Sequence, residues 1–543
     1  MIEKKLWKER LFSLEFWCKA FPWVWLVLAF TVTMGMLWTH GRAYIDSDIA
    51  SDLMLANLLN ETGTLVTDQW WYSTELRVVY LQMFWRIGLL LFPNDWYSAQ
   101  MFGQVLWMLA LIAAYFYVGR GLHLRGCGVW GAAALCCPFG GWYLWYGPFG
   151  GAYLPYMVYT LLLFGLIVHL LQPASRVRRI MQWGLLAVLS LIFGLTSIKI
   201  LMAVGLPMIV AVAAFYAYNL HKGRFEAAHQ YLPVLPAALV CFGGLAVGYV
   251  LNSKVLATMF SYGDFNQSVW GPLSPNALLK VFGDFLSLFG FAQDNYFHFD
   301  IPLFSLNGVL HVCSLGLALA LVCSVIYLLY RLAGLTPLHC LTVLYFVAAV
   351  LVQGCIFAFT AASFADAKYW LTIAPMIFVL MELAFQTFPF RLSLMRPVVG
   401  MAFCLLVLGS SVSSWGIFFS HPPHGDPELY QICNVLLEHG YTKGFTTFWS
   451  GDVLTEWSNG EIEVWVTKKS STLGLNKWLQ KVDHETPPEG PVFLLASDYE
   501  LETQNISALL EQNETLEVPS EKYNVILFAD YASLASQLEA LGG

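Results

Sequence analysis

The sequence carries little charge for its length. Asp, Glu, Lys and Arg make up 12% of its 543 residues, whereas a soluble domain carries about 25%. Hydrophobic residues make up 58%, and the mean hydropathy is +0.61. Apolar runs of about 20 residues, long enough to span a bilayer core of about 30 Å, recur along the chain. This composition excludes an ordinary soluble domain and predicts an integral membrane protein. The net charge of −8 argues against nucleic acid as a partner.

Two further absences narrow the class of protein. The chain has 11 cysteines but no CxxC pair, and most lie inside apolar runs, such as Cys313 and Cys404. This pattern supports neither a zinc site nor a disulfide framework. The apolar runs also hold almost no charge and show no internal repeat, whereas a transport pathway usually places ionisable groups inside its spans. The pattern therefore favours chemistry at the membrane surface over transport.

The apolar runs predict about eleven transmembrane helices, within a range of 11–13. They cover residues 22–39, 98–118, 127–146, 153–171, 182–198, 200–218, 232–252, 308–330, 338–360, 369–386 and 397–419. Segment 76–92 is a further candidate, and the charges of the loops decide its status. Basic residues gather at the N-terminus and at Arg120, Arg125, Arg176, Arg178, Arg179, Lys222, Arg224, Arg331, Arg391 and Arg396.

Basic loops stay cytoplasmic. All these clusters share one side only if segment 76–92 does not cross the membrane, so we expect it to lie along the surface. The alternative, a true span that tolerates its two arginines, would invert most of the downstream loops. The N-terminus is then cytoplasmic, and loops 40–97 and 253–307 and the C-terminal tail are external. Residues 47–60 and 76–92 are the predicted interfacial helices.

The composition becomes that of a soluble protein after residue 420. Residues 421–543 predict a small external α/β domain after a membrane domain of residues 1–420. Strands are expected at 444–449, 462–466, 491–496 and 523–528, and helices at 429–439, 452–457, 500–511 and 531–541, with Asp452 as the cap of the second. The domain has no Gly-rich phosphate loop, so a supporting or acceptor-binding role without catalysis is its simplest interpretation.

Three acids follow the first apolar run: Asp46, Asp48 and Asp52. The simplest interpretation is a helix that Asp46 or Ser47 caps and that carries Asp48 in its first turn, where the helix dipole tolerates an acid. A carboxylate at the membrane edge could also accept the proton of an acceptor hydroxyl as a general base. We therefore predict Asp46 and Asp48 as catalytic. Two carboxylates could bind Mg²⁺ or Mn²⁺ together with phosphate oxygens, and the sequence leaves the dependence on a metal open.

Several cations and aromatic residues are candidates for binding the substrate. A departing phosphate needs a positive charge nearby, and Lys199, Lys368 and Arg77 are placed on the outer face by the topology. Each could instead be an interfacial anchor. Trp70 and Tyr72 could pack against a sugar ring, and His298 could add a polar contact.

The pattern resembles the C-type (GT-C) superfamily of membrane glycosyltransferases, which includes protein O-mannosyltransferases and aminoarabinose lipid A transferases. The resemblance rests on a first span that ends in Asp46-Ser47-Asp48, an outer loop with interfacial helices, a multi-span body, a long second outer loop and an external C-terminal domain. It implies a GT-C-like fold and an inverting transfer of a sugar from polyprenyl phosphate to a lipid, glycan or protein acceptor. It also implies that the protein resides in a bacterial cell membrane. By this analogy the acid nearest the end of the first span, Asp46, is the base. Asp48 is a close competitor, because the two acids of the family's motif are usually adjacent, whereas here Ser47 separates them. A transporter or flippase of lipid-linked sugars and a non-catalytic scaffold are the alternatives.

Overall fold

The computed structural model describes residues 14–263, 270–290, 304–360, 367–392, 395–416 and 427–542. The chain divides into two compact units, and both are discontinuous in sequence. The first contains Met1–Met36, Leu106–Val250 and Gln267–Ser420, and the second contains Leu37–Val105, Leu251–Asn266 and His421–Gly543. The first long loop, residues 40–97, and the C-terminal tail thus belong to one unit, while the division into residues 1–420 and 421–543 stays a prediction.

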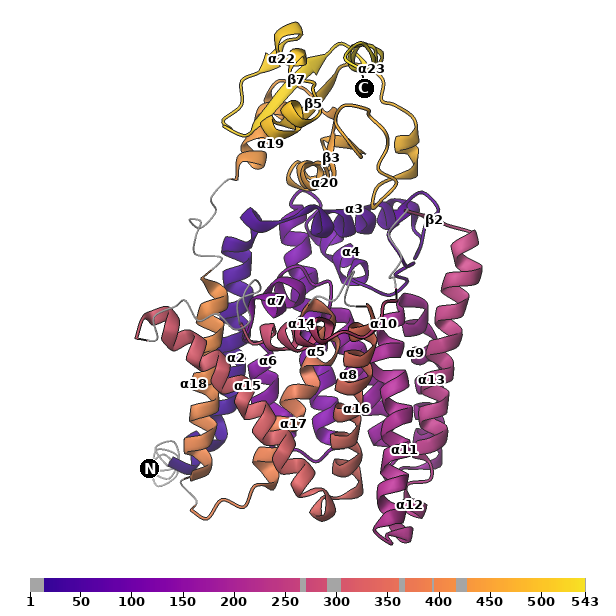
Figure 1. Cartoon of the computed structure of the whole chain (residues 1–543), viewed down its shortest axis with the longest axis vertical. Helices are drawn as coiled ribbons and strands as arrows, with labels where there is room; N and C mark the ends of the chain where they lie inside the picture. The colour runs from indigo at the N-terminus through magenta and orange to yellow at the C-terminus, as the bar shows by residue number, and fades with distance from the viewer. Residues whose placement is uncertain are drawn as a thin grey trace, which may run out of the picture. The chain divides into compact units, whose positions relative to one another are not determined.

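Long apolar helices account for most of the first unit (Figure 1). Among the described residues, nine helices are long and apolar enough to cross a membrane, and one bent pair could supply a tenth. The chain is therefore a multi-pass integral membrane protein. The nine are built on α2 (Leu14–His40), α5 (Trp96–Gly121), α9 (Arg176–Thr196), α11 (Leu206–His221), α13 (Val234–Val250), α15 (Leu306–Tyr330), α16 (Pro337–Thr360), α17 (Ala374–Thr387) and α18 (Met395–Trp415).

The predicted span 127–146 is wrong as a single helix. It is divided into α6 (Val129–Leu135), α7 (Gly141–Leu144) and the start of η3 (Trp145–Phe149). The break contains Pro138, which has no N–H for a helical hydrogen bond. After η3 the chain turns by 85° into α8 (Leu154–Leu170), which makes the bent pair. Nine or ten spans among the described residues therefore replace the eleven expected.

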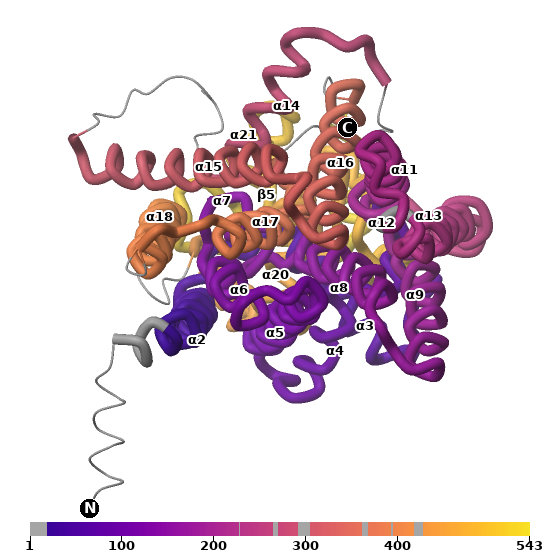
Figure 2. The backbone as a smooth tube through the Cα atoms, turned by 90° about the horizontal axis from the view of Figure 1, so that it is seen from below, coloured from indigo at the N-terminus to yellow at the C-terminus, as the bar shows by residue number. Residues whose placement is uncertain are grey.

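Helices of the first unit pack in pairs. α9 packs on α13, α11 on α16, and α15 on α18; in Figure 2, α9, α11 and α13 form one side of the unit and α15, α17 and α18 the other. Small residues allow the backbones of α9 and α13 to approach each other closely. A Cβ at Gly248 of α13 would lie 2.3 Å from the Leu191 carbonyl oxygen of α9. Small residues of this kind let helix backbones approach inside a membrane, where packing drives association.

The first loop of the second unit contains two helices. In α3 (Ser47–Thr62), the Asp46 side chain caps the N-terminus by accepting the Ile49 N–H at 3.0 Å, which confirms the predicted helix and its cap. The second helix, α4 (Gln82–Leu91), is shorter than the predicted 76–92. Its ten residues reach about 15 Å, half of the bilayer core, so it is too short to cross, as predicted. Arg86 of α4 donates to Asn60 of α3 at 2.8 Å.

A short two-stranded sheet connects distant parts of the second unit. β1 (Trp71–Tyr72) pairs in parallel with β2 (Ser261–Tyr262). On its other side, the Trp71 N–H donates to the Gln480 carbonyl, and the Leu479 N–H donates to the Trp71 carbonyl, both at 2.8 Å. Main-chain hydrogen bonds therefore join the first loop, the second loop and the tail.

The tail forms a five-stranded sheet with helices packed on it, which confirms the predicted α/β unit. The strand order is β4-β3-β5-β7-β6, with β3 parallel to β4 and β5, and β7 antiparallel to β5 and β6. Alternating apolar residues of the strands bury a core that includes Phe445, Leu494 and Ile526. The strands are β3 (Lys443–Thr447), β4 (Glu463–Thr467), β5 (Val492–Ser497), β6 (Thr515–Leu516) and β7 (Tyr523–Phe528).

One predicted cap in the tail is wrong. The helix α20 (Phe448–Trp457) begins four residues before Asp452, with Thr447 at its N-cap, so Asp452 lies inside the helix and is buried. The other helices of the tail are α19 (Glu428–Glu438), α21 (Asp498–Thr503), α22 (Ala508–Gln512) and α23 (Tyr531–Ala540), and α10 (Ile198–Ile200), α12 (Phe225–Gln230) and α14 (Pro275–Ser287) complete the first unit.

Candidate active site

Lys199 lies at the start of a transmembrane helix, against aromatic rings. It is the middle residue of α10, where the Ser197 hydroxyl accepts its backbone N–H at 3.1 Å. Its Nζ lies 5.7 Å from the ring centre of Tyr153 and 5.2 Å from that of Tyr156. Aromatic faces attract a cation, so these rings hold the ammonium group at the helix end.

Lys368 has the same kind of surroundings. It lies in η8 (Ala367–Ile373), directly before α17, and its Nζ is 5.2 Å from the ring centre of Tyr146 and 5.8 Å from that of Tyr369. Tyr153 contacts both of these rings, with centroid distances of 6.0 Å to Tyr146 and 6.1 Å to Tyr369. The first unit thus brings both predicted lysines to one tyrosine cluster, defined as Tyr146, Tyr153, Tyr156 and Tyr369.

The acidic residues of the first loop occupy the second unit. Asp46 caps α3, Asp48 lies in its first turn, and Asp52 follows one turn later. The Asp52 carboxylate pairs with Arg77, whose Nη1 lies 3.4 Å from Oδ2. Burial nevertheless raises the pKa of Asp52, and repulsion by Asp48 and Asp46 adds to the increase. Together these effects outweigh the attraction of Arg77 and bring the pKa to about 6. Arg77 also lies over the Tyr80 ring at 4.7 Å, so this predicted substrate ligand is engaged within the loop.

The helix α20 of the tail packs on α3 beside these acids. The Ser47 hydroxyl donates a hydrogen bond of 2.5 Å to the Phe448 carbonyl. α20 carries Asp452 and Glu456, which are only 1% and 2% exposed. Burial raises the pKa of Glu456 to about 8, against the attraction of Arg42, and raises that of Asp452 well above its usual range; repulsion by Asp46 and Asp48, respectively, adds to each effect.

Two of the predicted aromatic ligands are buried in this structure. Trp70 is 0% exposed and Tyr72 is 4% exposed, and the Tyr72 hydroxyl donates to the Thr67 carbonyl at 3.1 Å. Neither offers a free ring face to a sugar here. Their neighbour Trp71 is half-buried, with the Lys477 Nζ 4.7 Å from its ring centre. His298 lies outside the described residues.

The described residues contain no group of three or more His, Cys, Asp or Glu side chains arranged to hold a metal ion. The geometry therefore adds nothing to the expectation of Mg²⁺ or Mn²⁺, which stays a prediction.

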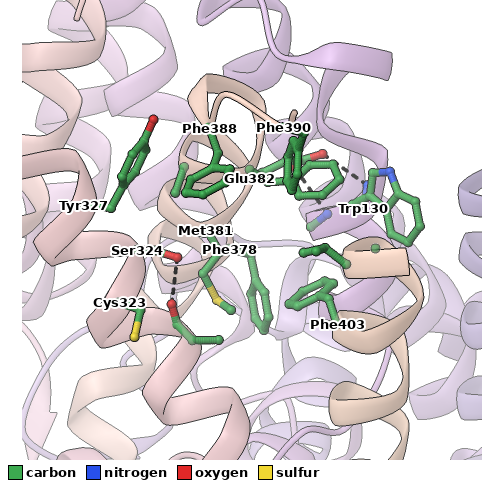
Figure 3. A pocket seen from close by; sticks show the side chains of 16 residues that line it. Trp130, Cys323, Ser324, Tyr327, Phe378, Met381, Glu382, Phe388, Phe390 and Phe403 are labelled. Carbon is green, nitrogen blue, oxygen red and sulfur yellow. Dashed lines mark hydrogen bonds between the residues drawn. The ribbon is translucent and has the colours of Figure 1, made fainter. Parts of the chain in front are cut away.

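The first unit also contains a partly open apolar cavity of about 310 Å³ between α6, α15, α17 and α18. Its one acid is Glu382 of α17, which points toward α6 (Figure 3) and accepts the N–H groups of Trp130 and Gly131 at 3.3 Å. Glu382 thereby satisfies the first N–H groups of α6, which have no partner within that helix. The aromatic and aliphatic lining is unsuited to a sugar or a phosphate, so this cavity is not our candidate site.

Sequence reasoning missed two groups of residues, one in each unit. The sequence could have indicated the tyrosine cluster, because four tyrosines and two tryptophans fall within residues 142–156, together with Gly and Pro. Asp452 and Glu456 had a fainter one, because two acids four residues apart lie on one helix face between aromatic residues. Only the packing of α20 on α3 shows that they join the acids of the first loop.

Solved structures identify the fold as that of the C-type membrane glycosyltransferases, as the resemblance predicted. The chain is similar to the aminoarabinose transferase ArnT of Cupriavidus metallidurans bound to undecaprenyl phosphate, with a TM-score of 0.59 and 13% identity over 95% of this chain and 99% of that chain. The apo state of ArnT gives a TM-score of 0.58 with the same identity and coverage. The Archaeoglobus fulgidus oligosaccharyltransferase complex with Zn and sulfate is less similar, with a TM-score of 0.45 and 11% identity over 90% of this chain and 69% of that chain.

No family model matches the chain, and no curated protein matches its sequence. The likeness to ArnT is therefore a likeness of fold.

Proposed function

We propose that this protein is an inverting glycosyltransferase that moves a sugar from a polyprenyl-phosphate donor to a lipid, glycan or protein acceptor at the outer face of the membrane. The observation that carries the proposal is the pair Lys199 and Lys368 on one tyrosine cluster. It occurs in a fold shared with an ArnT structure that holds undecaprenyl phosphate. In this proposal the N-terminus is cytoplasmic and residues 421–543 are external.

The two lysines stabilise the leaving group. As the bond between the sugar C1 and the phosphate oxygen breaks, negative charge grows on the phosphate, and cations held near it lower the barrier. The tyrosine faces hold both ammonium groups at the ends of apolar helices, where each lysine would otherwise be costly. A lipid phosphate is already stable as an anion, so its departure requires no general acid.

An acid of the first loop activates the acceptor. The acceptor oxygen forms a bond to C1 from the face opposite the phosphate, which inverts the anomeric centre, and its proton passes to the carboxylate of Asp46 or Asp48. Asp46 has the helix-capping hydrogen bond to Ile49 as a second task. Asp52 lies further along α3 and is engaged by Arg77 of the segment that follows this helix, so it is not our candidate for the base.

The test is a transfer assay with purified protein and a panel of polyprenyl-phosphate sugars and acceptors, with and without EDTA. We expect one donor to support transfer and Asp46→Asn or Asp48→Asn to reduce it by about 10²- to 10⁴-fold. Asparagine also caps helices well, so Asp46→Asn should keep α3 folded.

Asp68→Asn, which changes an exposed acid of the same loop, is the matched control and should retain full activity. Full activity in both Asp46→Asn and Asp48→Asn would exclude the proposed base. Absence of transfer with every donor in the wild-type protein would exclude the proposed reaction.

A further inference from the structure

Two acids of the tail are buried without the partners that buried acids need. Asp452 and Glu456 lie one turn apart on α20, and all four of their carboxyl oxygens are buried. None of the four has a hydrogen-bond partner among the residues that the structure describes. A buried polar group without a hydrogen bond costs about 1–3 kcal/mol, and an ionised one costs more. The fold therefore retains two unfavourable groups on one face of one helix.

The charged groups around this face are mostly acids. Asp48 raises the proton affinity of Asp452, and Asp46 raises that of Glu456. The opposing cation is Arg42 of η1 (Gly41–Tyr44), which also lies over the Tyr430 ring at 4.5 Å. Among the described residues, Arg42 thus attracts Glu456, whereas the acids at the start of α3 repel Asp452 and Glu456.

Among the described residues, the other elements that pack on α20 supply no cation that could offset the charge of an ionised Asp452 or Glu456. Glu463 of β4 is bonded to Lys481 at 2.7 Å and lies 3.3 Å from His484, and Lys443 of β3 donates to the Glu489 carbonyl at 3.4 Å. From α19, Cys433 donates to the Leu454 carbonyl at 3.9 Å. The hydroxyl of Tyr97 in α5 lies within electrostatic range of Glu456 but is donated to the Leu37 carbonyl. Two buried carboxylates in such surroundings are far less stable than two neutral acids.

We propose that α20 completes the acidic site, with Asp452 and Glu456 held as neutral carboxylic acids that keep the negative charge on Asp46 and Asp48. The proposal rests on the proposed function for its catalytic meaning, but the state of the two acids can be measured without it. Asp452 and Glu456 are then positioning residues, because they act through Asp46 and Asp48.

The chemical consequence concerns the base. An ionised carboxyl only accepts hydrogen bonds, whereas a protonated one also has an O–H to donate. Neutral acids beside Asp46 and Asp48 add no repulsion, so a first-loop carboxylate stays ionised and able to accept the proton of the acceptor. Ionisation of Glu456 above about pH 8 places a second negative charge beside that carboxylate, which raises the proton affinity of the base and so changes the pH dependence of transfer.

The direct test is infrared spectroscopy of the full-length protein at neutral pH, on the wild type and on Asp452→Asn/Glu456→Gln. Both replacements keep the size of the side chain and remain neutral. We expect the wild type to show the C=O stretch of buried carboxylic acids and the double variant to lose the part of its intensity that belongs to Asp452 and Glu456, while Glu382 still contributes. Glu502→Gln, which removes an exposed acid of α21, should leave the band unchanged. A wild type without the band, or a band of unchanged intensity in the double variant, overturns the proposal.

The pH profile of transfer supplies the second test. We expect the slope of wild-type kcat against pH to change near pH 8, where Glu456 ionises, and Glu456→Gln to lack this change, because glutamine cannot ionise. Thermal unfolding at each pH shows whether the protein remains folded. A change of slope near pH 8 that persists in a folded Glu456→Gln variant, or that is absent from the wild type, overturns the positioning role. Absence of transfer in the wild type contradicts only the proposed function, because the infrared result stands by itself.

Discussion

Both units of the molecule bury acids, but they surround them differently. In the first unit, Glu382 is 7% exposed and accepts three hydrogen bonds, from the Tyr115 hydroxyl at 3.1 Å and from the N–H groups of Trp130 and Gly131. In the second unit, Asp452 and Glu456 are more deeply buried, and their oxygens have no hydrogen-bond partner among the described residues.

The difference separates a structural acid from acids that the fold alone does not explain. Removing Glu382 would leave donors without acceptors, which is the costly change at a buried site. Removing Glu456 would leave no such donor among the described residues, so its retention requires another reason. Proximity to the predicted catalytic acids of α3 is that reason in our proposal.

Replacing the two kinds of acid by leucine should therefore have opposite consequences. We expect Glu382→Leu to lower the free energy of unfolding by about 2–5 kcal/mol, since it strands the Tyr115 hydroxyl and two N–H groups. Glu456→Leu should change stability by less than about 1 kcal/mol or increase it, since it removes an unsatisfied polar group. Unfolding by SDS titration in detergent measures both values.

A matched variant checks the mechanism behind this contrast. Glu382→Gln keeps one carbonyl acceptor and should lose about half as much stability as Glu382→Leu. Equal losses in Glu382→Leu and Glu456→Leu would remove the contrast between the two units.

Asp52 is an intermediate case, because it is buried with one cation, and it should make stability depend on pH. Its pKa is about 6 in the folded protein and 3.8 when exposed. The folded state thus binds more protons between these values, so its contribution is complete below about pH 4 and is lost as pH rises to 6. The loss amounts to about 3 kcal/mol.

The free energy of unfolding measured from pH 4 to 7, as the difference between wild type and Asp52→Asn, should show this slope. A difference that does not vary with pH would mean that Arg77 compensates fully for burial.

The lysines extend the comparison to half-buried cations, which lie against aromatic faces. We expect Lys199→Met or Lys368→Met to lower kcat/KM for the donor by about 10- to 100-fold through loss of phosphate stabilisation. Lys254→Met, which changes an exposed lysine at the end of another span, should have no effect. Tyr153→Phe retains an aromatic face and should cost less than about threefold. Lysine variants with unchanged kinetics would reduce both residues to interfacial anchors.

Most of the fold could be predicted because hydrophobic periodicity dominates this sequence. The long helices, the helix at 47–62 with its Asp46 cap and the α/β tail all follow from local patterns. The failure at 127–146 has a local cause as well, because an apolar run can hide a proline break. The grouping of residues 37–105 with the tail is different, since it depends on contacts between distant segments.

The candidate site was only partly predictable for a related reason. Lys199, Lys368 and the acids of α3 could be selected because charge is rare in this chain, so each charged residue near a span stands out. Tyrosines and buried tail acids do not stand out in the same way. From the sequence, Asp452 is a plausible helix N-cap. Only the structure shows that it lies in the middle of α20 and is buried, so it does not cap the helix.

The pairing of β1 with both β2 and residues 479–480 has a consequence for how this protein can change over generations. Its hydrogen bonds use only main-chain atoms, so side chains there can be exchanged while the connection persists. Because the loop is hydrogen-bonded to the tail, loss of the tail would also change the surroundings of the loop. A shortened chain that ends before the tail would leave the exposed edge of β1 open to pairing with another molecule, so the tail cannot be shed as an interchangeable module.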